Sequence, residues 1–221
     1  MPGGIPIGEL CERYESLYTG AITDELDERG YQNQTIRGGV EPLDPSLSMA
    51  GTAHTAVGHR NTDVDPEEQI REHLRMVGEA PEHGVLVIEA NDDVSAQVGE
   101  LMTTSLMGQG CRGCLCDGGT RDTEFILDQG FPVFTGHRTP EDSVPRWELL
   151  NWDTDVVVGG VKISPGDIVV GDRDGVVVVP REVAAKVLEA AEDRIGDETR
   201  VREEIRKGTS PLEAYDEFGV F

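Results

Sequence analysis

The chain has 221 residues, enough for one well-filled domain, and its composition does not indicate a second. Its 19 Lys and Arg residues stand against 43 Asp and Glu residues, a formal net charge of −24 that argues against direct binding to nucleic acid or to anionic membranes. Because no uncharged apolar run approaches the length of a membrane span, the sequence predicts a cytoplasmic protein.

The acidic residues are spread over the whole chain, and only three of the cations are lysines: Lys162, Lys186 and Lys207. Scattered acid with scarce lysine is typical of the solvated surface of a protein from a salt-rich cytoplasm, where screening removes the self-repulsion. We therefore expect the protein to lose structure in low salt.

Between Gly8 and Gly30, apolar residues recur at spacings of three and four, which predicts two amphipathic helices. Thr19 is a candidate cap between the two helices, and Gly30 is the predicted stop. Strands are then predicted over Ile36–Val40 and Met49–Val57, with a proline-containing turn region between them.

The segment Asp65–Glu68 predicts a helix start, since it supplies a cap, a first-turn proline and an acid at the third position. This helix should carry Ile70, Leu74 and Val77 inward. The next run, Val85–Ile88, is apolar at every position, which predicts a central parallel strand buried on both faces.

The next predicted unit contains the candidate site. Gly99–Met102 should open a helix that runs toward Gln109, and Arg112–Cys116 should form a strand that stops at a glycine turn before Arg121 and Asp122. Ligands bind outside the carboxyl ends of parallel strands, so Arg121, Asp122 and the free amides of the helix start should share one edge of the sheet. The sequence thus predicts a site for a small carboxylate beside a cation-binding acid, with a structural Arg–Asp pair as the alternative.

The C-terminal half is predicted to complete a mixed sheet and to end in helices. The predicted strands are Phe131–Phe134, Asp155–Val158, Ile168–Val170 and Val176–Val179. From Arg181 a long helix should bury Val183, Val187 and Ala191, with a possible bend at Gly196, before the segment Pro211–Phe218.

Of the four cysteines, Cys111, Cys114 and Cys116 are predicted to be small buried strand residues. Cys111, Cys114 and Cys116 lie close together, and Cys11 lies far from them in the sequence. A zinc or iron–sulfur site is the alternative, but no second Cys or His pair stands at a suitable spacing.

Beyond these patterns, the sequence resembles a known family. Glu100 is followed after twenty residues by Arg121-Asp122, within Asp117-Gly-Gly-Thr-Arg-Asp. This arrangement resembles the family that holds the regulator of ribonuclease E activity A and the 4-hydroxy-4-methyl-2-oxoglutarate aldolases. Further similar segments run through nearly the whole chain: Thr23–Asp27, Ala50–Ala53, Val158–Val161, Pro165–Asp167, Asp174–Pro180 and Lys207–Ser210.

The resemblance implies an α/β fold, a layered swivelling β/β/α-type domain over residues 1–221. It would have a mixed central sheet, helices packed around it and a C-terminal helical tail over 181–221, and would assemble as a homotrimer or hexamer. In the aldolase branch, Mg²⁺ or Mn²⁺ lies near the carboxylate matching Asp122, and the arginine matching Arg121 contacts substrate. The amides matching Gly99, Glu100, Leu101 and Met102 hold the pyruvate carboxylate. The aldolases carry Asp where this chain has Glu100.

The activity implied is that of a divalent-metal-dependent class II aldolase. It would cleave a 4-hydroxy-2-oxo dicarboxylic acid, such as 4-hydroxy-4-methyl-2-oxoglutarate, to pyruvate and a second 2-oxo acid, and could decarboxylate oxaloacetate through the same enolate. Arg121 would place a fixed positive charge beside the enolate and so stabilise it. Glu100, acting through a metal-bound water, is the nearest candidate base. A Schiff-base lysine is the other route, but all three lysines are predicted to be solvated.

Several other residues are weaker candidates for the site. In the family, acids of a neighbouring subunit approach it, and Glu198, Glu203 and Glu204 are the candidates here, although a solvated helix face is preferred for each. Arg146 could reach a distal substrate carboxylate, with a surface role preferred. The five histidines fit no metal-ligand spacing and are predicted to be surface or core-edge residues: His54, His59, His73, His83 and His137.

Two other functions remain as alternatives. The first is a non-catalytic protein-binding regulator, as in the branch that inhibits a ribonuclease. The second is a demethylmenaquinone methyltransferase, for which the sequence offers no glycine-rich nucleotide-binding strand–loop–helix.

Overall fold

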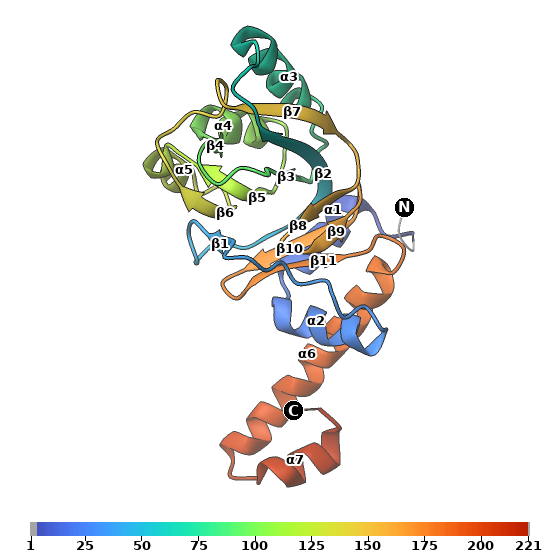
Figure 1. The fold of residues 1–221 in the computed structure, drawn as a ribbon. Coiled ribbons are helices and arrows are strands. Elements are labelled where there is room, and N and C mark those ends of the chain that lie inside the picture. The colour runs from blue at the N-terminus through green and yellow to red at the C-terminus, as the bar shows by residue number, and fades with distance from the viewer. Residues whose placement is uncertain (1–3, 221) are drawn as a thin grey trace.

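The computed structural model describes residues 4–220, so residues 1–3 and 221 of the predicted domain lie outside it. The chain forms an α/β domain with a mixed sheet and helices around it, as predicted (Figure 1). The helices are α1 (Ile7–Glu15), α2 (Thr19–Glu28), α3 (Pro66–Gly78), α4 (Glu100–Gly108), α5 (Thr123–Gln129), α6 (Ala184–Arg206) and α7 (Pro211–Phe218).

Nine strands form one sheet in the order β1-β6-β5-β3-β2-β10-β11, with β4 added to β5 and β7 added to β2. The strands β8 and β9 form a separate antiparallel pair. The bounds of the strands are β1 (Glu41–Pro42), β2 (Met49–Arg60), β3 (Gly84–Glu89), β4 (Ala96–Val98), β5 (Gly113–Thr120), β6 (Val133–Arg138), β7 (Trp147–Trp152), β8 (Val156–Val158), β9 (Val161–Ile163), β10 (Ile168–Asp172) and β11 (Gly175–Val179).

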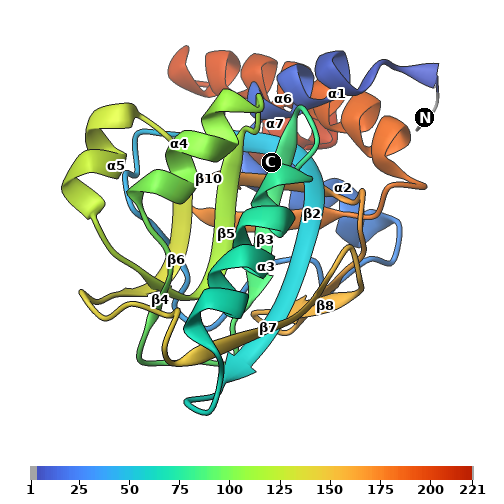
Figure 2. The ribbon, with the colours of Figure 1, turned by 90° about the horizontal axis from the view of Figure 1, so that it is seen from above.

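The strand β3 lies parallel to both β2 and β5, which confirms the central strand predicted from its apolar run. Its alternate residues enter two different cores, because successive side chains of a strand point to opposite faces. Leu86 and Ile88 pack under α3 and α4, whereas Val85 and Val87 pack toward β8 and β9. A third core lies between β10, β11 and the helices α1, α2 and α6. Figure 2 shows α3 lying over β3 and β5.

Several local predictions were wrong. The segment 36–40 is not a strand, since Gly38 and Gly39 have φ of +88° and +80° and only Thr35 forms a bridge, to Val177. Thr19 is the first residue of α2 and does not cap it; its amide and hydroxyl donate to Asp172.

Two further corrections concern α3 and β5. Ile70 and Leu74 are not directed into the core, because 39% and 65% of their surfaces are exposed, and only Val77 of the predicted inward set is buried. The strand β5 does not stop at a glycine turn at Cys116. It continues through Gly118 and Gly119 to Thr120 with a shift in its pairing to β6.

The C-terminal helices match the predicted tail. The helix α6 buries Val187 and Ala191 and runs as one helix through Gly196, whereas Val183 is only its partly buried cap residue. Figure 1 shows the second half of α6 extending away from the sheet with α7 against it. Within residues 4–220, no helix has both the length and the apolarity needed to cross a bilayer.

Candidate active site

The site is formed where β4 and β5 end side by side. Val98, the last residue of β4, accepts hydrogen bonds from the amide of Arg121 at 2.9 Å and from the hydroxyl of Thr120 at 3.1 Å. These bonds hold the start of α4 against the turn between β5 and α5. The predicted convergence of Gly99, Arg121 and Asp122 at one edge of the sheet is therefore present in the structure.

Asp122 has an unusual backbone conformation that directs its carboxylate toward α4. It occupies the cap position of α5 with φ of +58°, in the left-handed region that non-glycine residues rarely adopt. Its side chain does not cap α5. Instead, Oδ2 accepts from the amide of Glu100 at 3.3 Å and lies 3.5 Å from Nε of Arg121. A strained residue at such a position is typical of a functional site.

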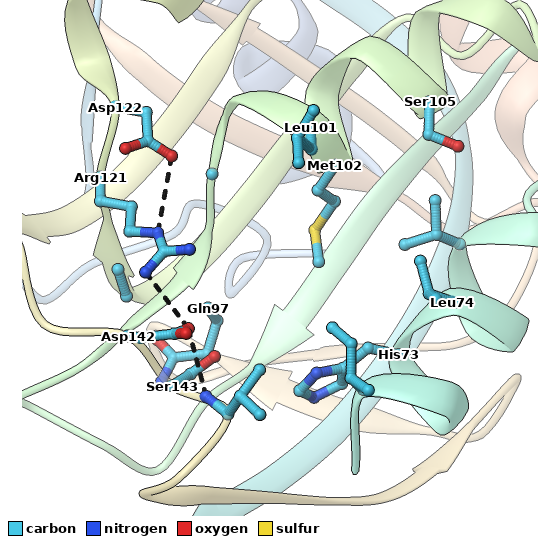
Figure 3. A pocket seen from close by; sticks show the side chains of 15 residues that line it. His73, Leu74, Gln97, Leu101, Met102, Ser105, Arg121, Asp122, Asp142 and Ser143 are labelled. Atoms are coloured by element: carbon cyan, nitrogen blue, oxygen red, sulfur yellow. Dashed lines mark hydrogen bonds and ion pairs between the residues drawn. The ribbon is translucent and has the colours of Figure 1, made fainter. Parts of the chain in front are cut away.

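Arg121 lies between two carboxylates. Its Nε faces Asp122, and one terminal nitrogen lies 3.4 Å from Oδ1 of Asp142, a residue that the sequence analysis did not select (Figure 3). Both distances are long for ion pairs, and 36% of the arginine side chain is exposed. Because exposed ion pairs of this kind contribute little stability, the guanidinium remains available to an anionic ligand.

Glu100 contributes its main chain to the site but not its side chain. Its Oε1 accepts hydrogen bonds from Thr104 at 2.7 Å and from Gln129 at 3.0 Å, so the carboxylate is directed toward α5. The amides of Leu101 and Met102 belong to the first turn of α4 and have no acceptor within the helix. These two amides and the helix dipole favour an anion at this end of α4.

A pocket of about 220 Å³ opens beside these groups (Figure 3). This volume is below the roughly 300–1,000 Å³ of sites for drug-sized ligands, which suits a small molecule. Its polar end contains Gly99, Arg121, Asp122 and Asp142. The rest is lined mainly by α3, α4 and the segment after Asp142, with the residues Ile70, His73, Leu74, Val77, Ala96, Gln97, Leu101, Met102, Ser105, Ser143 and Val144.

His73, predicted to be a surface or core-edge residue, is buried and lines this pocket. Its ring stacks on Trp147 with centroids 5.3 Å apart, and only 6% of the residue is exposed. Its Nε2 is buried and has no hydrogen-bond partner among residues 4–220. Burial lowers the pKa of His73 to about 4. A sequence signal existed, because His73 lies three residues after Ile70 and four before Val77, on the same helix face.

The other candidate residues do not line the pocket within this chain. Arg146 pairs with Glu141 at 3.1 Å and donates to the main chain of Asp142. Lys162 is exposed and pairs with Asp155 at 2.7 Å. Glu198, Glu203 and Glu204 lie on the far half of α6.

The cysteines are buried, as predicted, although only Cys114 and Cys116 lie in a strand. Burial raises the pKa of the Cys114 and Cys116 thiols, which makes them poor nucleophiles and poor metal ligands.

The carboxylates near Arg121 fit a hard divalent ion with few protein ligands. Among the described residues, no three His, Cys, Asp or Glu side chains converge, so a closed all-protein metal site is not formed there. Mg²⁺ usually keeps several waters and can be held by as few as one carboxylate, and Asp122 and Asp142 are the two carboxylates among the residues that line the pocket. The side chains of both are 42% exposed and can be reached from the pocket.

The sequence of the chain is similar to those of known proteins. A sequence model of the RraA-like family, described as Aldolase/RraA, matches residues 19–178. A curated relative from Halalkalibacterium halodurans, named "Putative 4-hydroxy-4-methyl-2-oxoglutarate aldolase", is 28% identical over 94% of this chain and 93% of its own.

Solved structures share the fold over most of the chain. One, described as a structure of novel cellulases from microbes associated with the gut ecosystem, is 34% identical with a TM-score of 0.86 and covers 90% of each chain. Another is Streptomyces coelicolor RraAS2, described as an unusual member of the RNase ES inhibitor RraA protein family. It is 26% identical with a TM-score of 0.79 and covers 91% of this chain and 99% of its own.

Proposed function

The chain belongs to the RraA-like family, and on this premise we propose that it is a divalent-metal-dependent lyase that cleaves a 4-hydroxy-2-oxo acid to pyruvate and a second carbonyl compound. The observation that carries the proposal is the meeting of Arg121, Asp122 and the free amides of α4 at one small pocket. A pocket of this size suits a short acid.

In the proposed reaction, the 4-hydroxyl loses its proton, the C3–C4 bond breaks, and its electron pair passes into a pyruvate enolate that is then protonated at C3. The amides of Leu101 and Met102 would bind the substrate carboxylate, and Arg121 would stabilise the negative charge that develops on the 2-oxo oxygen. Asp122 and Asp142 would hold the metal ion. When bound, such an ion acts as a Lewis acid that polarises the 2-oxo group.

Glu100 remains our candidate base, acting through a water molecule. To act, its carboxylate must leave Thr104 and Gln129, with which it bonds in the structure. A homotrimeric or hexameric assembly, proposed from the family resemblance, would bring a second chain to the open side of the pocket.

The test is pyruvate release from a panel of 4-hydroxy-2-oxo acids and oxaloacetate at high salt with Mg²⁺. We expect Asp122→Ala to abolish release and exhaustive dialysis against EDTA to do the same to the wild type. Asp128→Ala is the matched control, because Asp128 is an exposed aspartate on α5 outside the pocket. Release that survives removal of the metal would refute the metal-dependent reaction.

A second candidate is a non-catalytic regulator that binds a ribonuclease. It is supported by the likeness to RraAS2, described as a member of an RNase inhibitor family. Absence of turnover on every acid of the panel, together with direct binding to a ribonuclease of the E type, would favour this function.

A further inference from the structure

We infer that the distal half of the pocket takes an uncharged, largely apolar substituent, so that the preferred ligand is a 2-oxo acid with a single carboxylate. This inference rests on the proposed function for the end of the ligand that reacts. It departs from the dicarboxylic substrates that the resemblance implied.

The first observation is the charge of the lining. Of the fifteen described residues that line the pocket, Arg121 is the one permanent cation, and it already faces Asp122 and Asp142. One ligand carboxylate beside Arg121 and the amides of α4 would use this positive charge. A second carboxylate deeper in the pocket would add a further negative charge with no second cation among these fifteen residues to receive it, which is costly in a partly desolvated site.

The second observation is the chemistry of the distal wall. The lining includes Ile70, Leu74 and Val77 of α3 and Met102 of α4. Figure 3 shows Leu74 and Met102 on the side of the pocket away from Asp122. Ile70 and Leu74 are 39% and 65% exposed, so the fold leaves these apolar side chains unburied at the pocket. An apolar substituent on the ligand would cover them and release the water beside them.

The third observation is His73, the remaining group that could offer charge there. It is 6% exposed, and its buried Nε2 has no hydrogen-bond partner among residues 4–220. Burial lowers the pKa of His73 to about 4, so the ring is neutral at pH 7. A neutral imidazole can bond to an uncharged hydroxyl or carbonyl, but it does not supply the charge that a carboxylate needs.

Arg146, the cation that the sequence suggested for a distal carboxylate, is not among the residues that line the pocket. Its side chain pairs with Glu141 and donates to the main chain of Asp142 at 2.9 Å. These contacts favour a structural role for Arg146.

The test compares two ligand pairs that differ only in replacing a distal carboxylate by an isopropyl group of similar shape. For turnover, we compare 4-hydroxy-2-oxoglutarate with 4-hydroxy-5-methyl-2-oxohexanoate, with pyruvate quantified by chromatography. For binding without turnover, we compare 2-oxoglutarate with 5-methyl-2-oxohexanoate by calorimetry in the presence of Mg²⁺. We expect the isopropyl compound to be favoured at least tenfold in each pair.

A substitution in the distal wall should change the preference between the isopropyl compound and the dicarboxylate. Leu74→Arg places a cation at an exposed position of the distal wall and should shift the ratio toward the dicarboxylate at least tenfold. Leu212→Arg is the matched control, because Leu212 is similarly exposed on α7 and lies outside the pocket. It should leave the ratio unchanged.

The results separate this inference from the proposed function. Preferential binding of 5-methyl-2-oxohexanoate without any pyruvate release would support the pocket chemistry and contradict the lyase. Pyruvate release with a preference for 4-hydroxy-2-oxoglutarate would support the lyase and overturn the inference. A wild-type preference for 2-oxoglutarate in binding, or a ratio unmoved by Leu74→Arg, would also overturn it.

Discussion

At the scale of single residues, the site is held loosely enough to accept a ligand. The ion pairs of Arg121 with Asp122 and Asp142 are 3.5 and 3.4 Å long, and neither carboxylate is fully buried. Exposed pairs of this kind contribute about 0–1 kcal/mol, whereas a ligand carboxylate would add charge-assisted bonds from the guanidinium and from free amides. The glycine at position 99 lets the carboxylate of Asp122 lie close to the start of α4, since a Cβ there would lie 3.0 Å from Oδ2 of Asp122.

His73 makes stability depend on pH. Burial lowers its pKa to about 4, below the ordinary value of 6.5. Between these two pH values the unfolded chain binds a proton that the folded chain does not, so stability falls as the pH drops from 6.5 toward 4. In urea unfolding, we expect the wild type to lose about 2 kcal/mol more between pH 7 and pH 5 than His73→Phe, which keeps a ring on Trp147.

Equal losses in wild type and His73→Phe would show that the imidazole titrates normally in the folded protein.

At the scale of elements, the end of β5 depends on glycine for close packing. Gln97 accepts from the amide of Gly119 at 3.0 Å and donates to Asp92 at 3.0 Å, so its side chain crosses directly over the strand. A Cβ on Gly118 would lie 2.1 Å from Oε1 of Gln97 and 2.6 Å from Cβ of Ala90. Because Gly118 and Gly119 have no side chains, β5 can continue beneath the side chain of Gln97 as far as Thr120, next to Arg121. The sequence had predicted a turn at these glycines.

Gly118→Ala should accordingly destabilise the protein by about 1–3 kcal/mol, the usual cost of overpacking a tight site. Gly108→Ala is the control, because a Cβ at this last residue of α4 meets nothing within 4 Å. It should be neutral or stabilising by up to about 1 kcal/mol, since alanine favours helix. Denaturant unfolding of both variants measures the difference, and equal stability would contradict the packing argument.

At the scale of the whole molecule, acidic residues outnumber basic ones, and a single cation can contact several carboxylates. Arg194 of α6 contacts Asp24, Glu25 and Glu28 of α2, which joins the two helices. Burial alone would raise the pKa of Glu25, but hydrogen bonds from Arg194 and Arg29 lower it overall. With 43 acids against 19 cations, most acids lack such a partner and repel one another.

We therefore expect salt to stabilise the fold. At low ionic strength the repulsion acts across the molecule, whereas at about 1 M salt the Debye length falls to about 3 Å and removes it. The midpoint of thermal unfolding should rise steadily from dilute buffer to molar KCl, with structure lost at the dilute end. A midpoint that stays flat over this range would contradict the prediction.

Features that depend on a single short segment could be predicted from the sequence. The cap and proline of Asp65–Glu68 place the start of α3, and the side chain of Asp65 accepts from the amides of Glu67 and Glu68. The apolar run of β3 predicted its central position. Arg121, Asp122 and the start of α4 were also expected to meet, because the carboxyl ends of neighbouring parallel strands share one edge.

What the sequence by itself determined is therefore most of the larger elements, the mixed α/β fold and the converging loops, since periodicity, caps and turn residues act within a few neighbours. Only the tertiary structure decided that Ile70, Leu74 and His73 line a pocket, that Asp142 shares Arg121, and that the side chain of Glu100 is directed toward α5. Periodicity shows which helix face is apolar, but whether that face meets the core or a cavity depends on segments that lie far away in the chain.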